Sequence, residues 1–191
     1  MIRIAIVGDI GSGKSYLAKL LGFPVFNADL EVIKIYNKNR KCFLKLNKKL
    51  PKFIKSFPIK KEEIANSIIS NGKNLKKITK IVHPIIKSKM FNFINKYKRK
   101  KAVVLDIPLY LENKINKKED IIIFVSAKKS KINNRLKKRS KFNLKLFKKF
   151  QKIQLPVRVK KKKSNFIIKN DFKHESFCKN VKILKKIILN K

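Results

Sequence analysis

Residues 8–15, GDIGSGKS, place glycines, a lysine and a serine at spacings that suit the binding of a polyphosphate. They directly follow an apolar run and fit the pattern G-x-x-x-x-G-K-[ST] in its strand–loop–helix context. In such a loop, backbone N–H groups point at the phosphates and glycines allow close approach. Lys14 would reach the β- and γ-phosphates, and Ser15 would hold Mg²⁺. The match at every fixed position disfavours an ordinary glycine-rich turn, so we predict a nucleotide-binding protein.

Phosphoryl transfer also needs a group that positions or deprotonates the acceptor hydroxyl. Acidic residues are scarce, with 11 Asp and Glu in the chain. Asp29 follows a short apolar run, so we expect it at the carboxyl end of a central strand, facing the phosphate loop. That position suits a general base. The alternative is a helix N-cap, since Asp is favoured immediately before a helix.

Two further residues have both a functional and a structural interpretation. Asp106 ends an apolar run and suits an outer-shell contact to Mg²⁺ or to the loop serine, but it could also form a strand-end turn into Pro108. His83 precedes Pro84 within a helical pattern. It could contact a substrate or satisfy local backbone groups.

The elements that must position these residues are short apolar runs separated by helix-like stretches. The runs lie at residues 2–7, 25–26, 102–105, 121–125 and 166–168. This alternation predicts an α/β fold with a central parallel sheet and crossover connections. The closing stretch should form a helix that packs on the sheet through residues at helical spacing, namely Phe177, Val181, Leu184, Ile187 and Ile188.

Two segments between the predicted strands are longer than a simple crossover connection. Residues 30–101 have helical spacing in two clusters of aliphatic residues: Ile64, Ile68 and Ile69, then Ile78, Ile81, Val82 and Ile85. We predict a helical insertion over the carboxyl edge of the sheet, where ligands bind in open α/β folds. The second segment, 128–163, contains Arg135 and Arg139, which would share one face of a helix. We expect a single domain spanning residues 1–191, with its core at about 1–29, 102–127 and 164–191.

The formal charge of +41, from 52 Lys and Arg, ordinarily points to nucleic acid. Here the basic residues are mostly Lys, are spread along the chain, and accompany many Ile, Asn and Phe residues. All of these have A- and T-rich codons, so genome bias explains the charge, and a selected polyanion partner remains the alternative. We expect the lysine tracts, such as residues 160–163, to be mostly solvated faces.

The remaining composition predicts a cytoplasmic protein with no membrane segment. No stretch approaches the roughly 18 to 20 apolar residues that a spanning helix needs. Cys42 and Cys178 lie far apart and lack metal-site spacing. We expect both to be reduced thiols.

Several motifs together resemble dephospho-CoA kinases in order and approximate spacing. They are the loop at 8–15, NAD at 27–29, VHPI at 82–85, VLDIPLYLE at 104–112, RLKKR at 135–139, and residues 154–170. The resemblance covers nearly the whole chain. It implies a P-loop NTPase three-layer fold of the nucleoside-monophosphate-kinase type, with a helical CoA-binding insertion at 30–101 and a mobile lid at 128–163. Its reaction would transfer the γ-phosphoryl group of Mg²⁺-ATP to the ribose 3′-hydroxyl of dephospho-CoA, giving CoA and ADP.

The resemblance also implies roles for individual residues. ATP would be bound by Gly11, Ser12, Gly13, Lys14, Ser15, Tyr16 and, near the adenine, Asn170. The dephospho-CoA pocket would be shaped by Asp29, His83, Pro84, Leu109 and Glu112. The catalytic groups would be Asp29, which activates the acceptor, Lys14, and the lid arginine Arg139, which stabilises charge on the transferring phosphoryl. Closure of the lid would exclude water and suppress ATP hydrolysis.

The chain departs from the family pattern at four positions. Asp9 replaces the glycine that usually follows Gly8, and Asn27 replaces the first carboxylate of the usual Asp-Ala-Asp. Ser140 stands where an acidic residue is expected, and Ser164-Asn165 replaces the usual Ala-Asp. These changes bear on efficiency more than on identity, because the residues that carry the chemistry remain.

Two other functions stay open. One is another small-molecule P-loop kinase with a nucleoside or nucleotide acceptor. The other is a non-catalytic, basic nucleic-acid-binding P-loop protein, which would bind polyanions in a salt-dependent way. No recognised nucleic-acid motif or aromatic cluster accompanies the charge. We therefore expect ATP and dephospho-CoA as partners, no specific nucleic acid, and a monomer with at most weak self-association.

Overall fold

The computed structural model describes residues 1–138 and 142–190. The chain divides into two compact units. The first comprises Met1–Asn27, Lys96–Phe142 and Ile153–Lys191, and the second comprises Ala28–Asn95 and Asn143–Lys152.

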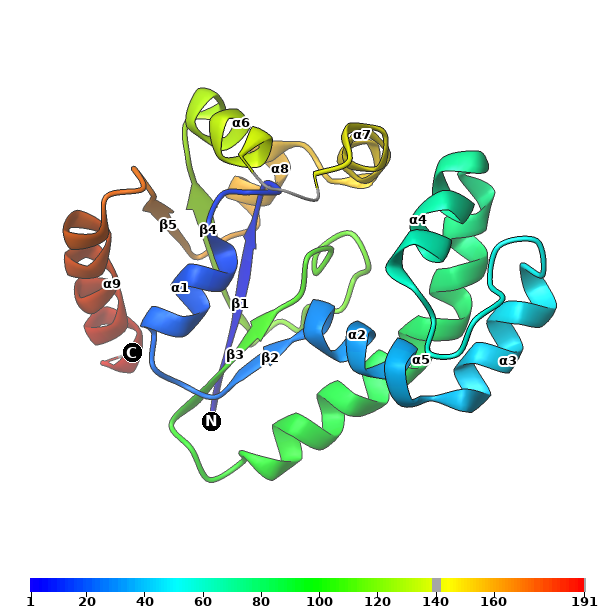
Figure 1. Cartoon of the computed structure of the whole chain (residues 1–191). Coiled ribbons are helices and arrows are strands. Elements are labelled where there is room, and N and C mark those ends of the chain that lie inside the picture. The colour runs from blue at the N-terminus through cyan, green and yellow to red at the C-terminus, as the bar shows by residue number, and fades with distance from the viewer. Residues whose placement is uncertain (139–141, 191) are drawn as a thin grey trace. The chain divides into compact units, whose positions relative to one another are not determined.

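The first unit is built on a five-stranded parallel sheet, as the apolar runs predicted (Figure 1). Its strands are β1 (Ile2–Gly8), β2 (Val25–Asn27), β3 (Ala102–Asp106), β4 (Ile121–Ser126) and β5 (Phe166–Lys169). Their order across the sheet is β2-β3-β1-β4-β5. Every residue of β3 is buried, as expected for a strand with neighbours on both sides and helices on both faces.

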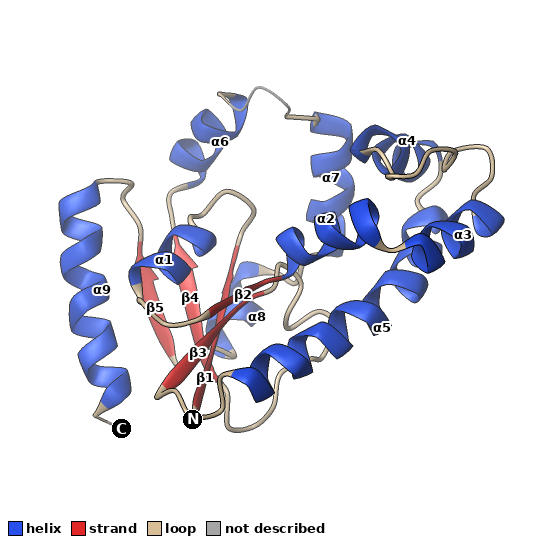
Figure 2. Ribbon diagram, turned by 60° about the horizontal axis from the view of Figure 1, so that its bottom comes forward, coloured by secondary structure: helices blue, strands red, loops and turns tan. Residues whose placement is uncertain are grey.

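Helices cover both faces of this sheet, which confirms the three-layer prediction. On one face α1 (Lys14–Leu20) and α9 (His174–Leu189) form a core with Ile4, Ile6 and Val104. The short helix α8 (Val157–Lys162) lies on the other face (Figure 2). On that face Lys161 Nζ lies 5.9 Å from the centre of the Phe124 ring. A further helix, α6 (Lys129–Lys137), follows β4. The predicted packing of α9 is confirmed except at Ile187, which is 46% exposed because it falls beside the apolar stripe.

The strand order corrects one expectation. The strand before Asp29 was predicted to be central, yet β2 lies at the edge of the sheet and pairs with β3. Its three residues are too few to show from the sequence how many neighbours it has. The interior position belongs to β1, which pairs with both β3 and β4 and leads into the phosphate loop.

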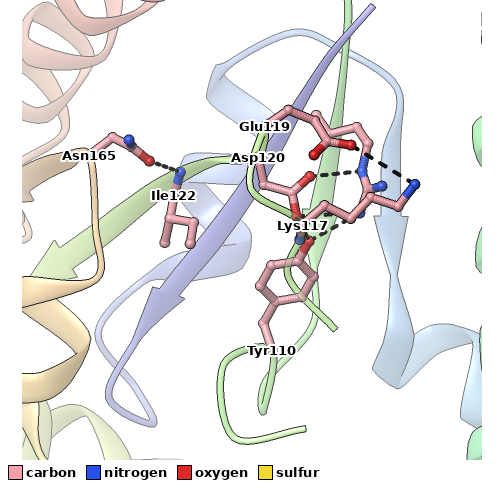
Figure 3. A network of polar contacts seen from close by, with 7 residues as sticks. Tyr110, Lys117, Glu119, Asp120, Ile122 and Asn165 are labelled. Carbon is pink, nitrogen blue, oxygen red and sulfur yellow. Dashed lines mark hydrogen bonds and ion pairs between the residues drawn. The ribbon is translucent and has the colours of Figure 1, made fainter. Parts of the chain in front are cut away.

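A buried polar network anchors the segment that follows β3 (Figure 3). The Asp120 carboxylate receives the Arg3 guanidinium, with Nε 3.0 Å from Oδ1, and also the Tyr110 hydroxyl and the Lys117 backbone N–H. Burial, followed by the contact with Asp120, raises the pKa of Tyr110. These bonds tie the turn-rich segment 107–120 to β1, so that it is held at both ends.

Asn165, one of the departures from the family pattern, also has a structural role. Its side-chain oxygen accepts the Ile122 backbone N–H at 2.8 Å, and its own N–H donates to the Ile122 carbonyl at 2.9 Å (Figure 3). A neutral amide accepts this hydrogen bond as a carboxylate would. The replacement therefore keeps the start of β5 joined to β4.

The second unit is helical, as predicted. It contains α2 (Ala28–Lys38), α3 (Arg40–Lys49), α4 (Lys61–Ser70), α5 (Lys73–Lys96) and most of α7 (Leu144–Ile153). The core of the unit is formed by buried side chains from α2 to α5 and the α3–α4 connection, including Ile35, Leu46, Ile54, Ile68, Ile78 and Val82. Leu146 and Phe150 of α7 pack against this core. The segment 128–163 is thus divided, with α6 and α8 in the first unit and α7 in the second.

Both cysteines are free, as expected, and burial raises the pKa of the Cys42 thiol. Within residues 1–138 and 142–190, no helix combines the length and the apolar character needed to cross a membrane.

Candidate functional site

The phosphate loop, residues 8–15, begins at the carboxyl end of β1 and continues into the first turn of α1. Gly8, Gly11 and Gly13 all have positive φ, and at two of them an added Cβ would also clash with other parts of the chain. Gly13 has φ 101°, and a Cβ there would lie 2.3 Å from Asn170 Nδ2. Gly8 has φ 150°, and a Cβ would lie 2.8 Å from the Val125 carbonyl oxygen. The loop therefore has the close-packed backbone that a phosphate cradle needs.

Lys14 lies folded back over this loop. Its Nζ donates to the Gly8 carbonyl at 3.0 Å and to the Asp9 carbonyl at 2.9 Å. The ammonium is thus held within the loop by backbone oxygens. The first turn of α1 contains no acidic residue, so the partial positive charge at its N-terminus adds to that of Lys14.

Ser15 and Tyr16 occupy the first turn of α1 and are exposed. The Tyr16 hydroxyl is hydrogen-bonded to His174 Nδ1, and its ring stacks on Phe177 at 5.7 Å between centroids. Partial desolvation, together with the Cys178 thiol, raises the pKa of Tyr16. This residue therefore joins the start of α1 to α9.

Asn170 lies directly beneath the loop and is 3% exposed. Its side-chain N–H donates to the Ser12 carbonyl at 2.9 Å, and its side-chain oxygen accepts the Phe172 N–H at 2.9 Å. The Arg135 guanidinium lies 4.7 Å from the centre of the Phe172 ring. The structure shows Asn170 as a support of the loop, and its expected place near the adenine stays a prediction.

Asp106 is the last residue of β3 and is 3% exposed. β3 runs parallel to β1, with Leu105 opposite Ala5. Asp106 therefore lies at the carboxyl end of the sheet, the end from which the phosphate loop departs. Asn27 is its register partner on β2 and donates from Nδ2 to Asp106 Oδ2 at 2.7 Å. A carboxylate at position 27 would repel Asp106, whereas the amide donates a hydrogen bond to it. The departure at Asn27 therefore gives Asp106 a hydrogen-bond donor in place of a second carboxylate.

Leu109 and Glu112 belong to the anchored segment after β3. Glu112 Oε1 accepts the Leu155 backbone N–H at 2.9 Å, so this carboxylate fixes the chain just before α8. Leu109 forms part of a turn, because its carbonyl accepts the Asn113 N–H. The substrate-binding roles expected for both residues stay predictions.

The second unit carries the other predicted acceptor-side residues. Asp29 is exposed and lies inside the first turn of α2, so its interpretation as the residue that caps this helix is wrong. It favours that helix through its charge near the N-terminus. His83 and Pro84 are exposed within α5, and partial desolvation lowers the pKa of His83. Arg139 and Ser140 lie outside the described residues.

One polar contact of the loop was missed by the sequence analysis. Lys160, expected to be part of a solvated tract, is only 2% exposed, while residues 161–163 are exposed as expected. Its Nζ lies 2.8 Å from Asp9 Oδ1 and 3.5 Å from Gln154 Oε1. No pattern in the lysine run distinguishes it. The carboxylate at position 9, a departure within the phosphate loop itself, is therefore paired.

Comparisons with known proteins agree with this geometry. The family model described as dephospho-CoA kinase matches residues 2–175. A dephospho-CoA kinase from Bartonella quintana is 32% identical over 170 residues, covering 86% of this chain and 87% of that protein. One from a Wolbachia of Brugia malayi is 32% identical over 186 residues, covering 94% of each. The crystal structure of TT1252 from Thermus thermophilus aligns with a TM-score of 0.80 at 23% identity, over 99% of this chain and 97% of that one, and shows the same fold.

Proposed function

The chain belongs to the dephospho-CoA kinase family, and from that membership we propose that it transfers the γ-phosphoryl group of ATP to the 3′-hydroxyl of dephospho-CoA. The products are CoA and ADP. The observation that carries the proposal is the formed phosphate loop, in which Lys14 Nζ is held by the Gly8 and Asp9 carbonyls at the entrance to α1. A loop of this kind supplies positive charge and backbone donors for a polyphosphate.

On the ATP side, we assign binding to the loop and its support: Gly11, Ser12, Gly13, Lys14, Ser15, Tyr16 and Asn170. Phosphoryl transfer involves little covalent chemistry for the protein, so positioning and charge stabilisation dominate. Lys14 offsets negative charge on the β- and γ-phosphates. Asn170 preserves the loop conformation through its bond to the Ser12 carbonyl.

On the acceptor side, Asp29 accepts the proton of the 3′-hydroxyl as the oxygen attacks phosphorus. His83, Pro84, Leu109 and Glu112 bind and orient dephospho-CoA. Arg139 stabilises charge on the transferring phosphoryl group, and residues 128–163 act as the lid that excludes water. These roles are supported by the match of each residue to the family motifs.

Two oxygen groups in the first unit fit Mg²⁺, a hard cation that prefers oxygen ligands and near-octahedral geometry. The Ser15 hydroxyl is exposed at the start of α1, and Asp106 brings an ionisable carboxylate to the same sheet edge as the loop. Ser15 would hold the ion, and Asp106 would act from its outer shell. When bound, Mg²⁺ neutralises charge on the phosphate oxygens. Among the described residues no group of three or more His, Cys, Asp and Glu could hold a metal, while Mg²⁺ in such kinases is held largely by phosphates and water.

The substrates then set the other expectations. We propose that the protein works in the cytoplasm, where ATP is supplied, and that it works as a monomer. Its positive charge attracts anionic substrates without requiring a specific nucleic-acid partner.

A direct test combines purified protein with Mg²⁺-ATP and dephospho-CoA, with nucleosides and AMP as parallel acceptors, and identifies products by mass. We expect CoA only when dephospho-CoA is present. Lys14→Ala should reduce its formation by about 100-fold or more, the scale of losing one charge-stabilising group. Lys19→Ala, which alters an exposed lysine at the other end of α1, is the matched control. Phosphorylation of a nucleoside or of AMP in place of dephospho-CoA would contradict the proposal.

A further inference from the structure

Lys160 is a buried lysine next to the phosphate loop. It belongs to α8, which packs on the sheet beside β1, and it is 2% exposed. A buried ammonium is costly unless it is paired and hydrogen-bonded. Asp9 provides that pairing at 2.8 Å, and the Gln154 side-chain oxygen lies at the outer limit of a hydrogen bond, 3.5 Å away.

Asp9 connects this lysine to the cation of the loop. Its side chain receives Lys160, while its backbone carbonyl accepts Lys14 Nζ at 2.9 Å and the Ser12 N–H at 3.1 Å. One residue of the loop thus takes up two lysines, one through its carboxylate and one through its backbone. A change in the net charge at Asp9 would therefore change the electrostatic potential where the phosphates bind.

We propose that Lys160 is a positioning residue for ATP, which neutralises the Asp9 carboxylate and keeps it directed away from the phosphates. The inference rests on the proposed binding of ATP at this loop. Without the Lys160 ammonium, the unpaired Asp9 carboxylate would repel a polyphosphate bound beside it. The Asp9 side chain would also no longer be held by Lys160, so the Asp9 carbonyl that accepts Lys14 would be less firmly positioned. In this chain, which has a carboxylate where glycine is usual, Lys160 makes that carboxylate compatible with the binding of ATP.

Two other roles for Lys160 predict different behaviour. A lysine that contacts phosphate directly would be needed whatever residue stands at position 9. A lysine that only fills space would affect stability but not the salt dependence of ATP binding. Neutralisation of Asp9 instead predicts that removal of the carboxylate makes the lysine dispensable for binding.

The experiment measures ATP affinity by titration calorimetry, with melting temperature as the check on folding, for Lys160→Met, Asp9→Asn and the double variant. Lys160→Met should weaken ATP binding about tenfold, equivalent to about 1.4 kcal/mol. That loss should shrink as salt rises, because the Asp9 carboxylate is partly exposed and its repulsion of the phosphates is screened by salt. Asp9→Asn and the double variant should both bind within about threefold of wild type, a difference below 1 kcal/mol. Lys162→Met, an exposed neighbour on α8, is the matched control and should bind like wild type.

Equal loss of affinity in Lys160→Met and the double variant would overturn the proposal, as would unchanged affinity in Lys160→Met. If Lys160→Met does not fold, a folded double variant with near-normal affinity supports the pairing, and a double variant that also fails to fold or to bind overturns it. Because binding is measured without acceptor, a protein that binds ATP yet makes no CoA contradicts the proposed function while the pairing is still tested.

Discussion

The phosphate loop is determined by residues close together in the sequence, whereas the helical second unit depends on contacts between residues far apart in the sequence. The loop is local, with residues 8–15 carrying its glycines, its cation and its hydroxyl. The helical unit gathers its core from residues as distant as Ile35 and Phe150. Local spacing specifies a loop because backbone conformation is set within a few residues. The surface of the helical unit takes its shape only after several helices have packed together. The positions of Asp29 and His83 on that surface therefore depend on the core of the helical unit.

The two units also have separate cores. One core packs α1 and α9 against the sheet. The other packs helices α2, α3, α4, α5 and α7 against one another. If binding of ATP depends on the first core and the acceptor roles of Asp29 and His83 depend on the second, substitutions in the second unit should affect the acceptor and leave ATP binding unchanged. Each of the following variants tests that separation, and a mixed phenotype would break it.

Asp29→Asn should have the largest effect. Loss of a general base typically costs about 10²- to 10⁴-fold in rate, so we expect turnover to fall within this range. ATP affinity, measured by titration, should stay within about threefold because the loop is untouched. Glu62→Gln, which neutralises another exposed carboxylate in the first turn of a helix in this unit, serves as the control. Near-normal turnover in Asp29→Asn would remove this residue from its proposed role.

His83→Ala should have a smaller and more selective effect. The loss of one polar contact with the substrate is worth about 1 kcal/mol, which corresponds to a rise of roughly fivefold in KM for dephospho-CoA. The KM for ATP should not change. Steady-state kinetics with each substrate varied in turn measures both, and Lys80→Ala, an exposed change one turn earlier on α5, controls for the helix surface. An equal rise in both KM values would argue against a site specific to the acceptor.

The same contrast explains what could be predicted from the sequence. The strand at residues 2–7, the loop after it and Asp106 were predicted correctly in place, since apolar runs and motif spacing are local signals. The helical insertion was predicted from the periodicity of residues such as Ile68, Ile78 and Val82, all of which are buried. The signal that predicts each of these features lies within a few turns of chain, although the packing that buries the residues is long-range.

The features that escaped prediction depend on partners far along the chain. The edge position of β2 is set by pairing with β3, about 80 residues later, and not by its own three residues. Lys160 is buried by α8 and β1 and paired with Asp9, yet it looks like its exposed neighbours in the sequence. Asn170 directly follows β5, the edge strand next to β4, and its contact with the Ser12 carbonyl in the loop was not predicted. Long-range pairing of this kind leaves no periodic pattern in the residues that take part.

Lys149→Met should have the smallest effect and offers the sharpest test of the separation. Lys149 Nζ donates to the Ile68 and Ile69 carbonyls at 2.7 and 2.8 Å, in the last turn of α4, where carbonyls lack helical partners. A cation at a helix C-terminus contributes about 0.3–1 kcal/mol, so hydrogen exchange in α4 should speed up by only a few fold. Lys148→Met, one position away and exposed, should leave exchange unchanged. Because α7 packs on the helical core, the variant should loosen that unit without changing ATP affinity. A parallel loss of ATP affinity would mean that α7 couples the two substrates, and the lid would then have to be considered part of both sites.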